Sequence, residues 1–389
     1  MSSKSRWLIF AVSTPLVIIA AVGGLLGASP ARQQTFPQLS IFNEVVELIR
    51  DNYVEPVDTD KVMEGAMRGL AEELDPESAY LTSDEVVAIN AATVLGPADA
   101  GVTVTRQFYL RVLGVREGSP AARAGLLTDD FIRAIDGKST RDMSAFTGTR
   151  LLHGAPGSKV TLTVIRGNAA EPHIVELTRD AATMAPTTSR RLPTGEGYLH
   201  LATFAPGTAA LLTQHIDALR QAGAATLVID LRGTSDGSID EGIAAARLFV
   251  KTGTLAIRAG RDNRDRVTIA AQAGDGAITI PVELLVSSGT ADAAEVFAAA
   301  LDAAHRAELV GEHTAGLAGV QHLITLPDGR GLWMTDARYL LPDGTPILEH
   351  GLEPAIAIDT PRVAFDDVAP STDATLMKAL ERLKMKKAA

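Results

Sequence analysis

The chain has 389 residues, a length that allows two or three hydrophobic cores. Its net charge is -11 at pH 7 and it has no basic tract, which argues against a nucleic-acid partner. The absence of cysteine excludes disulfides, thiolate catalysis and cysteine-ligated zinc.

The N-terminal segment predicts export. Lys4 and Arg6 precede residues 7–31, which carry no charge, and positive residues that stay on the cytoplasmic side direct the rest of a chain outward. The apolar run is longer than a typical signal core and so favours a membrane anchor; a signal cleaved after Ala31 is the alternative. We assign residues 1–34 to this signal or anchor and its linker. The expected location is periplasmic or extracytoplasmic, tethered to the cytoplasmic membrane or secreted after cleavage.

Residues 35–92 predict a small helical subdomain. Apolar residues recur at helical spacing over 41–49, Pro56 ends that helix, and a second helix follows with the same spacing over 63–74. The stretch "LDPESAYLTSDEV" then forms a turn into a short third helix. We find no chemistry in this region.

The period changes to two in residues 93–168, where "GVTVTRQFYLRVLGV" and "KVTLTVIRG" alternate like strands and "DDFIRAIDGK" leads into an Asp-Gly hairpin turn. In residues 169–362 apolar strands such as "ATLVIDLRG" and "PVELLVSS" alternate with helices, which predicts an α/β layer. Residues 363–389 form a tail and an amphipathic helix with a basic last turn. The predicted fold class is α+β.

Several segments, in this order, resemble the carboxyl-terminal processing peptidases. They are "DNYVEPVD", "LDPESAYL", "SPAARAGL", "APGSKVTLTVIRG", "VIDLRG", "GEHTAGLAGVQ" and "TDARYLLPDGTPILEHGLEPAIAI". The resemblance implies an exported serine peptidase with a PDZ domain, a ClpP/crotonase-like α/β core, a serine nucleophile and a lysine base. It also implies no cofactor, and a homo-oligomer or pairing with an active relative.

The two catalytic positions depart from that pattern. The family's elbow usually reads Gly-Ser-Ala-Ser-Ala-Ser-Glu with the middle serine attacking, whereas residues 289–295 read "GTADAAE" and place Asp292 there. The lysine position in "GEHTAGLAGVQ" is Leu317. By the same comparison Gln321, which assists the lysine, and the helix residue Asp302 are retained.

The oxyanion loop is also altered, because the loop "DLRGTSDGS" has Asp236 in place of a glycine and keeps only Gly237. An ionised carboxylate at position 292 adds negative charge where the transition state develops negative charge. Losing both dyad members lowers the catalytic rate by a factor on the order of 10⁶. Residues 252–377 contain no lysine, so no other residue of this segment can supply the lysine base. We therefore predict a pseudopeptidase.

An active peptidase with a non-standard centre is the alternative. Its hydroxyl candidates are Ser287, Ser288 and Thr290, and its base candidates are His305, His313 and His322. The spacing of Asp292, His313 and His322 matches no metal-ligand pattern, so we expect no metal.

A PDZ domain binds an extended chain end by strand addition, with loop N–H groups on its carboxylate. By resemblance "DAGVTV" is the carboxylate loop with the strand that follows, and Asp99 stands where the family prefers glycine, which predicts repulsion of a bound carboxylate. The expected peptide contacts are Gly101, Val102, Thr103, Val104, Phe146 and Leu151. The expected ligands are polypeptide C-termini or exported proteins.

Overall fold

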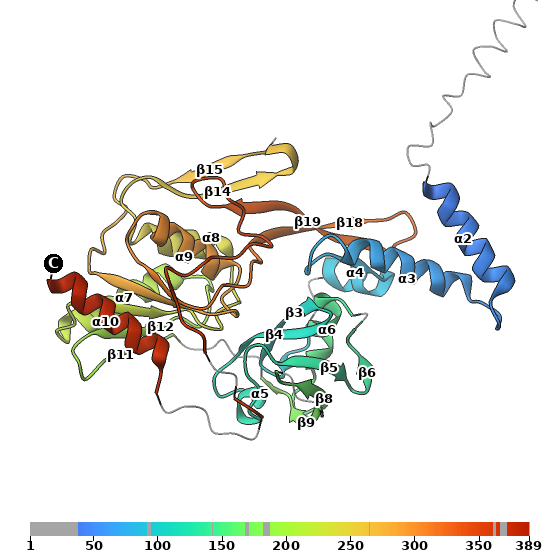
Figure 1. Ribbon diagram of the computed structural model, residues 1–389, viewed down its shortest axis with the longest axis horizontal. Coiled ribbons are helices and arrows are strands. Elements are labelled where there is room, and N and C mark those ends of the chain that lie inside the picture. The colour runs from blue at the N-terminus through green and yellow to red at the C-terminus, as the bar shows by residue number, and fades with distance from the viewer. Residues whose placement is uncertain are drawn as a thin grey trace, which may run out of the picture. The chain divides into compact units, whose positions relative to one another are not determined.

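The computed structural model describes residues 38–91, 95–141, 143–167, 171–181, 187–263, 265–360, 363–365 and 372–388 (Figure 1). The predicted signal or anchor, residues 1–34, lies outside these ranges. Within them, no helix has the length and apolar character needed to cross a membrane. The chain divides into two units, residues 1–66 and residues 67–389.

The first unit contains helix α2 (Gln38–Asn52) and the start of α3 (Thr59–Glu72), which are the two helices expected from apolar spacing. None of the fifteen residues of α2 is buried. Its apolar side chains are largely exposed, Leu39 and Ile41 by more than half.

The PDZ region of the second unit is built on an antiparallel sheet in the order β3 (Val102–Gln107), β4 (Tyr109–Val115), β5 (Phe131–Ile135), β8 (Lys159–Ile165), β9 (His173–Thr178), with β6 (Lys138–Ser139) paired to β5. Helices α5 (Pro120–Arg123) and α6 (Ala145–Leu152) accompany it, and β2 (Ala98–Asp99), β7 (His153–Gly154) and β10 (Asp180–Ala181) form a small second sheet. The predicted Asp-Gly hairpin is present, because Asp136 and Gly137 have φ angles of 49° and 75°.

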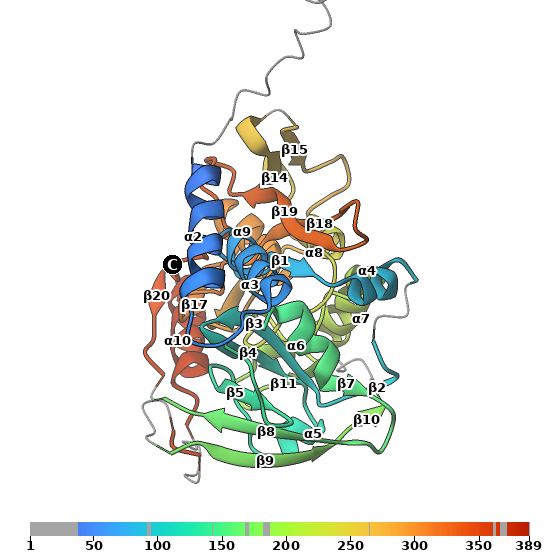
Figure 2. The same cartoon turned by 90° about the vertical axis from the view of Figure 1, so that its right-hand side faces the viewer.

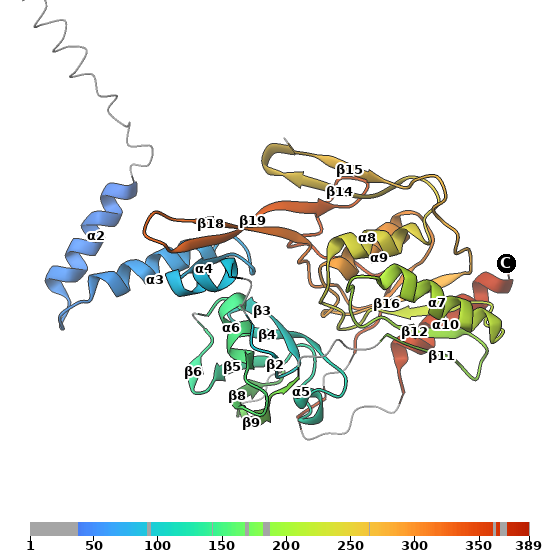
Figure 3. The same cartoon turned by 180° about the vertical axis from the view of Figure 1, so that it is seen from behind.

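The peptidase-like core holds a sheet in the order β11 (Thr188–Arg191), β12 (Gly197–His200), β13 (Leu227–Asp230), β16 (Val282–Val286), β17 (Leu309–Gly311), β20 (Ile356–Ala357), parallel from β12 onward. Alternate residues face opposite sides. Helices α7 (Thr208–Gln221), α8 (Ile239–Arg247) and α9 (Ala293–Ala303) pack with Leu227 and Ile229, whereas α10 (Ala374–Ala388) packs with Val228 on the other face (Figure 3). The sheet is therefore buried on both sides.

A further sheet was not predicted. It joins β1 (Ala79–Leu81), β14 (Thr254–Gly260), β15 (Val267–Ala270), β18 (Gly319–Thr325) and β19 (Gly331–Leu340) (Figure 2). Short helix α4 (Ser83–Asn90) follows β1 and starts with a capping box between Thr82 and Glu85, and η1 (Arg261–Asn263) follows β14. Through β1 and β19, the segment after α3 is paired directly to the core.

Candidate functional site

The predicted strand-to-helix elbow is present, with Asp292 at its sharpest point. Strand β16 leads through residues 287–291 into α9, and Asp292 stands immediately before the helix. Its φ of 55° and ψ of −116° fall in a region that residues with a side chain rarely adopt. The elbow geometry is thus kept with a carboxylate in place of a hydroxyl.

One buried carboxylate joins the two positions that the resemblance assigns to the catalytic dyad. Glu295 is fully buried, and its Oε1 accepts hydrogen bonds from Thr314 Oγ1 at 2.5 Å and Gly316 N at 2.7 Å. Its Oε2 accepts from Leu317 N at 2.8 Å and Asp292 N at 3.0 Å. Burial raises the pKa of Glu295, and these donors oppose that rise. The sequence analysis did not predict that Glu295 links the two segments. The only signal in the sequence is that the family's elbow motif also ends in glutamate.

The electrostatic environment of Asp292 is negative. Burial raises the pKa of Asp292 well above its ordinary value, and the nearby charges of Glu77, Glu295 and Asp236 add to the effect. Glu77 comes from the segment after α3 and accepts a hydrogen bond from Thr105 of β3 at 2.6 Å. A site arranged in this way disfavours further negative charge, including that of a tetrahedral intermediate.

Leu317 is a packing residue. It is 6% exposed and forms a small apolar cluster with Leu113 of β4 and Ala291 of the elbow. Gln321 lies on β18, where its Nε2 donates to Thr335 Oγ1 at 3.4 Å. The position expected for a catalytic amine is therefore occupied by a contact between the core and the PDZ region.

Asp302 does not join this site. It lies near the opposite end of α9, ten residues beyond Asp292, and a rise of about 1.5 Å per residue separates the two by roughly 15 Å. Its retention in the sequence therefore contributes nothing to the dyad positions.

The remaining oxyanion donor is engaged within its own loop. The N–H of Gly237 donates to Asp236 Oδ1 at 2.9 Å. Gly237 has a φ of 118°, and a Cβ there would lie 2.4 Å from the backbone of Phe204, so the loop conformation requires glycine. Asp236 thus satisfies the donor that the resemblance assigns to an oxyanion.

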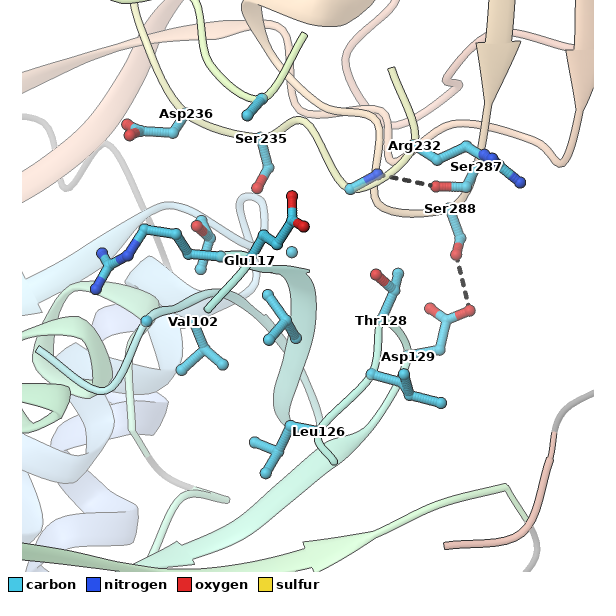
Figure 4. Close-up of a pocket in the computed structure, with 18 of the residues that line it drawn as sticks. Val102, Glu117, Leu126, Thr128, Asp129, Arg232, Ser235, Asp236, Ser287 and Ser288 are labelled. Atoms are coloured by element: carbon cyan, nitrogen blue, oxygen red, sulfur yellow. Dashed lines mark hydrogen bonds between the residues drawn. The ribbon is translucent and has the colours of Figure 1, made fainter. Parts of the chain in front are cut away.

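The three candidate hydroxyls have other partners. Ser287 Oγ accepts from the N–H groups of Gly233 at 3.3 Å and Gly289 at 3.2 Å, and Thr290 Oγ1 donates to a backbone carbonyl at 2.8 Å. Ser288 Oγ donates to Asp129 Oδ2 at 2.7 Å, the contact drawn in Figure 4.

The candidate histidines form other contacts, although His313 lines the same cavity as Ser287 and Ser288. His313 Nδ1 is 2.9 Å from the Thr314 carbonyl, His322 is exposed on β18, and His305 follows α9 with a φ of 53°. No hydrogen bond in the described part of the chain links a histidine to Ser287 or Ser288. The described residues also contain no group of three or more His, Cys, Asp or Glu side chains that could hold a metal ion.

A cavity of about 1480 Å³ opens between the PDZ region and the core (Figure 4). Gly101, Val102 and Thr103 line it, as expected. Val104 lies instead in the PDZ core at 5% exposure, and Val102 packs against the same core from the cavity side.

Two other expected peptide contacts also lie outside the cavity lining. Phe146 packs against Trp333 of β19, with 6.4 Å between ring centroids. Leu151 is partly buried against the PDZ core. Helix α6 presents these two side chains to neighbouring elements of the protein, and Thr149 of the same helix lines the cavity.

Asp99 has a partner that the sequence analysis did not foresee. Both of its carboxylate oxygens accept hydrogen bonds from the Arg116 guanidinium, one of them at 2.7 Å from Nη1. The pair lies beside Gly101, since a Cβ on that glycine would approach Arg116 Nη2 to 3.4 Å. The expected repulsion of a ligand carboxylate by Asp99 is therefore offset by Arg116.

Comparisons with known proteins agree with this architecture. The model of peptidase family S41 matches residues 195–358, the PDZ domain model matches residues 111–166, and the model of the activating protease CtpB N-terminal domain matches residues 22–85. The carboxy-terminal-processing protease of Bartonella bacilliformis is 30% identical over 334 residues, covering 85% of this chain and 77% of that protein. This chain belongs to the carboxy-terminal processing protease family.

Other relatives show the same extent of similarity. The carboxy-terminal processing protease CtpA of Bacillus subtilis is 29% identical, covering 83% of this chain and 69% of that protein. The solved structure of the photosystem II D1 C-terminal processing protease superposes with a TM-score of 0.67 at 27% identity, over 83% of this chain and 94% of that one. The PDZ region and core of this chain are therefore those of the carboxy-terminal processing proteases.

Proposed function

We propose that this chain is a pseudopeptidase that binds the C-terminal ends of exported polypeptides through its PDZ domain. The observation that carries the proposal is the pair of side chains at the dyad positions: the carboxylate of Asp292 and the buried isobutyl group of Leu317. A Ser/Lys mechanism needs a hydroxyl and an unprotonated amine at those positions, and these side chains supply neither.

The binding half of the proposal depends on the PDZ sheet. Strand β3 stands at the end of the sheet order, with β4 as its partner on one side. An edge strand of this kind presents backbone N–H and C=O groups to which an extended chain adds by strand pairing. Asp99 and Gly101 of the carboxylate loop before it line the cavity.

A serine-type peptidase with a non-standard centre is the second candidate, and one contact favours it. The hydroxyl of Ser288 donates to the carboxylate of Asp129 in the cavity. That carboxylate also accepts from Arg111 Nη1 at 3.0 Å. We rank this candidate second because the carboxylate that would take the serine proton is already in an ion pair with Arg111.

The deciding experiment measures binding and cleavage on the same samples. Purified full chain is mixed with a labelled unfolded polypeptide; anisotropy reports binding and mass spectrometry reports new ends. We expect binding without cleavage, and no labelling of Ser287 or Ser288 by a fluorophosphonate probe. Cleavage that persists in Asp292→Ala and disappears in Ser288→Ala would establish the second candidate instead.

A matched variant tests whether the scaffold still supports catalysis. Asp292→Ser with Leu317→Lys restores both dyad groups, and a cleavage rate above that of the parent chain would show that only those groups were missing. Leu317→Lys alone is the control, because it buries the amine without a hydroxyl to activate.

The location and assembly of the chain are part of the proposal. We infer an exported protein, tethered to the cytoplasmic membrane or secreted, that acts as a homo-oligomer or with an active relative. The charge pattern before residue 31 supports export, and the family resemblance supports association. Fractionation of cells that express a tagged chain, followed by light scattering of the purified protein, tests both points.

A further inference from the structure

We propose that the cavity between the PDZ region and the core selects polypeptide segments that carry lysine or arginine. This inference rests on the proposed function, because it names the chemistry of the polypeptides that the site receives. It follows from the charges that line the cavity and from the way the chain pairs them.

Carboxylates dominate the charged lining of the cavity. Among the described residues that line it are eight Asp or Glu side chains, three arginines and no lysine. The carboxylates are Asp99, Glu117, Asp129, Asp130, Asp230, Asp236, Glu312 and Asp359. Both parts of the protein contribute, the first four from the PDZ region and the last four from the core.

The three lining arginines are engaged by the chain's own carboxylates. The pairs are Arg116 with Asp99 at 2.7 Å, Arg166 with Asp130 at 2.6 Å, and Arg232 with Asp230 at 2.9 Å. Asp129 is paired as well, with Arg111. Each of these arginines therefore already has a carboxylate partner within the protein, and four of the eight carboxylates are neutralised.

The other four carboxylates, Glu117, Asp236, Glu312 and Asp359, form no ion pair with any described residue. Glu117 follows β4 and Asp236 follows β13, both are exposed, and Figure 4 shows both among the side chains of the cavity. A ligand in the cavity thus meets uncompensated negative charge from both sides.

Charge complementarity decides which polypeptide segments bind this cavity more tightly. A cationic side chain lowers the free energy of binding beside an unpaired carboxylate, and an anionic one raises it. Because these groups are in contact with solvent, the preference weakens as salt shortens the screening length. The same cavity reaches Ser287 and Ser288, so the selected segment lies along the elbow of the former active centre.

The test uses the full chain and three labelled peptides of one length with free C-termini, rich in lysine, glutamate or serine. Anisotropy is measured at about 0.05 M and 0.5 M salt. We expect the lysine peptide to bind most tightly at low salt, with the preference reduced at high salt. Glu117→Gln with Asp236→Asn is expected to weaken lysine-peptide binding by about 3- to 10-fold and to leave the serine peptide unchanged.

A matched control separates the cavity from the overall charge of the protein. Glu176→Gln with Asp217→Asn removes the same charge from exposed sites, 58% and 57% accessible, outside the cavity lining. Equal affinity for all three peptides, or an equal effect of the control, would overturn this inference while leaving polypeptide binding in place. Failure to bind any of the peptides would instead overturn the proposed function, and this inference with it.

Discussion

Replacing the buried carboxylate of Glu295 by an amide tests how the elbow and the Leu317 segment are held together. The carboxylate accepts four hydrogen bonds, two at each oxygen. Glu295→Gln keeps one oxygen and turns the other into an NH₂ group facing two donors. Each buried donor left unpaired costs about 1–3 kcal/mol, so the free energy of unfolding falls by about 2–6 kcal/mol.

The assay combines urea denaturation with amide hydrogen exchange. We expect a lower denaturation midpoint and faster exchange at the amide of Gly316 or at that of Leu317, depending on which of the two oxygen positions the NH₂ group takes. Glu353→Gln is the control, because its side chain is 78% exposed and its His313 contact is 3.9 Å long. A loss below about 1 kcal/mol in Glu295→Gln, or the same loss in the control, would refute the assignment of Glu295 as the link between the elbow and the Leu317 segment.

Three further predictions concern neighbouring contacts. Because burial raises the folded-state pKa of Asp292, its contribution to stability is complete below its unfolded pKa of about 3.9 and is lost as pH rises through the folded value. Asp292→Asn is therefore expected to gain stability relative to the parent as pH rises above about 4, and thermal melts with a difference that stays flat across pH would contradict this. Arg232→Ala leaves buried Asp230 without its cation and removes the ion pair with Asp373 that holds the start of α10. We expect the free energy of unfolding to fall by about 2–3 kcal/mol, which is below the range for a fully buried pair because Arg232 is partly exposed. Protease resistance of α10 in this variant would contradict the prediction. Leu113→Ala opens a gap against Leu317 and is expected to cost about 2–3 kcal/mol in chemical denaturation, whereas a neutral effect would show that the cluster relaxes.

The PDZ region contacts the elbow and the Leu317 segment through both apolar and backbone groups. Leu113 packs on Leu317, and a Cβ on Gly289 would lie 1.9 Å from the Leu113 carbonyl, so the elbow approaches β4 as closely as glycine allows. Leucine at position 317 strengthens this contact, because an apolar side chain is buried there at no desolvation cost. Leu317 thus supports the packing of the PDZ region on the core.

Several elements were predictable because their signals are local. The α2 and α3 helices follow apolar spacing, the hairpin at residues 136–137 follows the Asp-Gly pair, and the elbow follows a strand, small residues and a helix in succession. The sheet containing β14, β15, β18 and β19 was missed. It brings together strands whose sequences give no sign of which partner they pair with.

The sequence by itself determined which groups are absent, because folding brings side chains together but does not create a hydroxyl at position 292 or an amine at position 317. Only the tertiary structure decided how the remaining groups are used. Glu295 contacts donors 19 to 22 residues away, Arg116 neutralises Asp99, and Val104 is buried in the PDZ core. Hydrogen bonds and ion pairs depend on distances of a few ångströms between elements far apart in the chain, and local sequence carries no record of those distances.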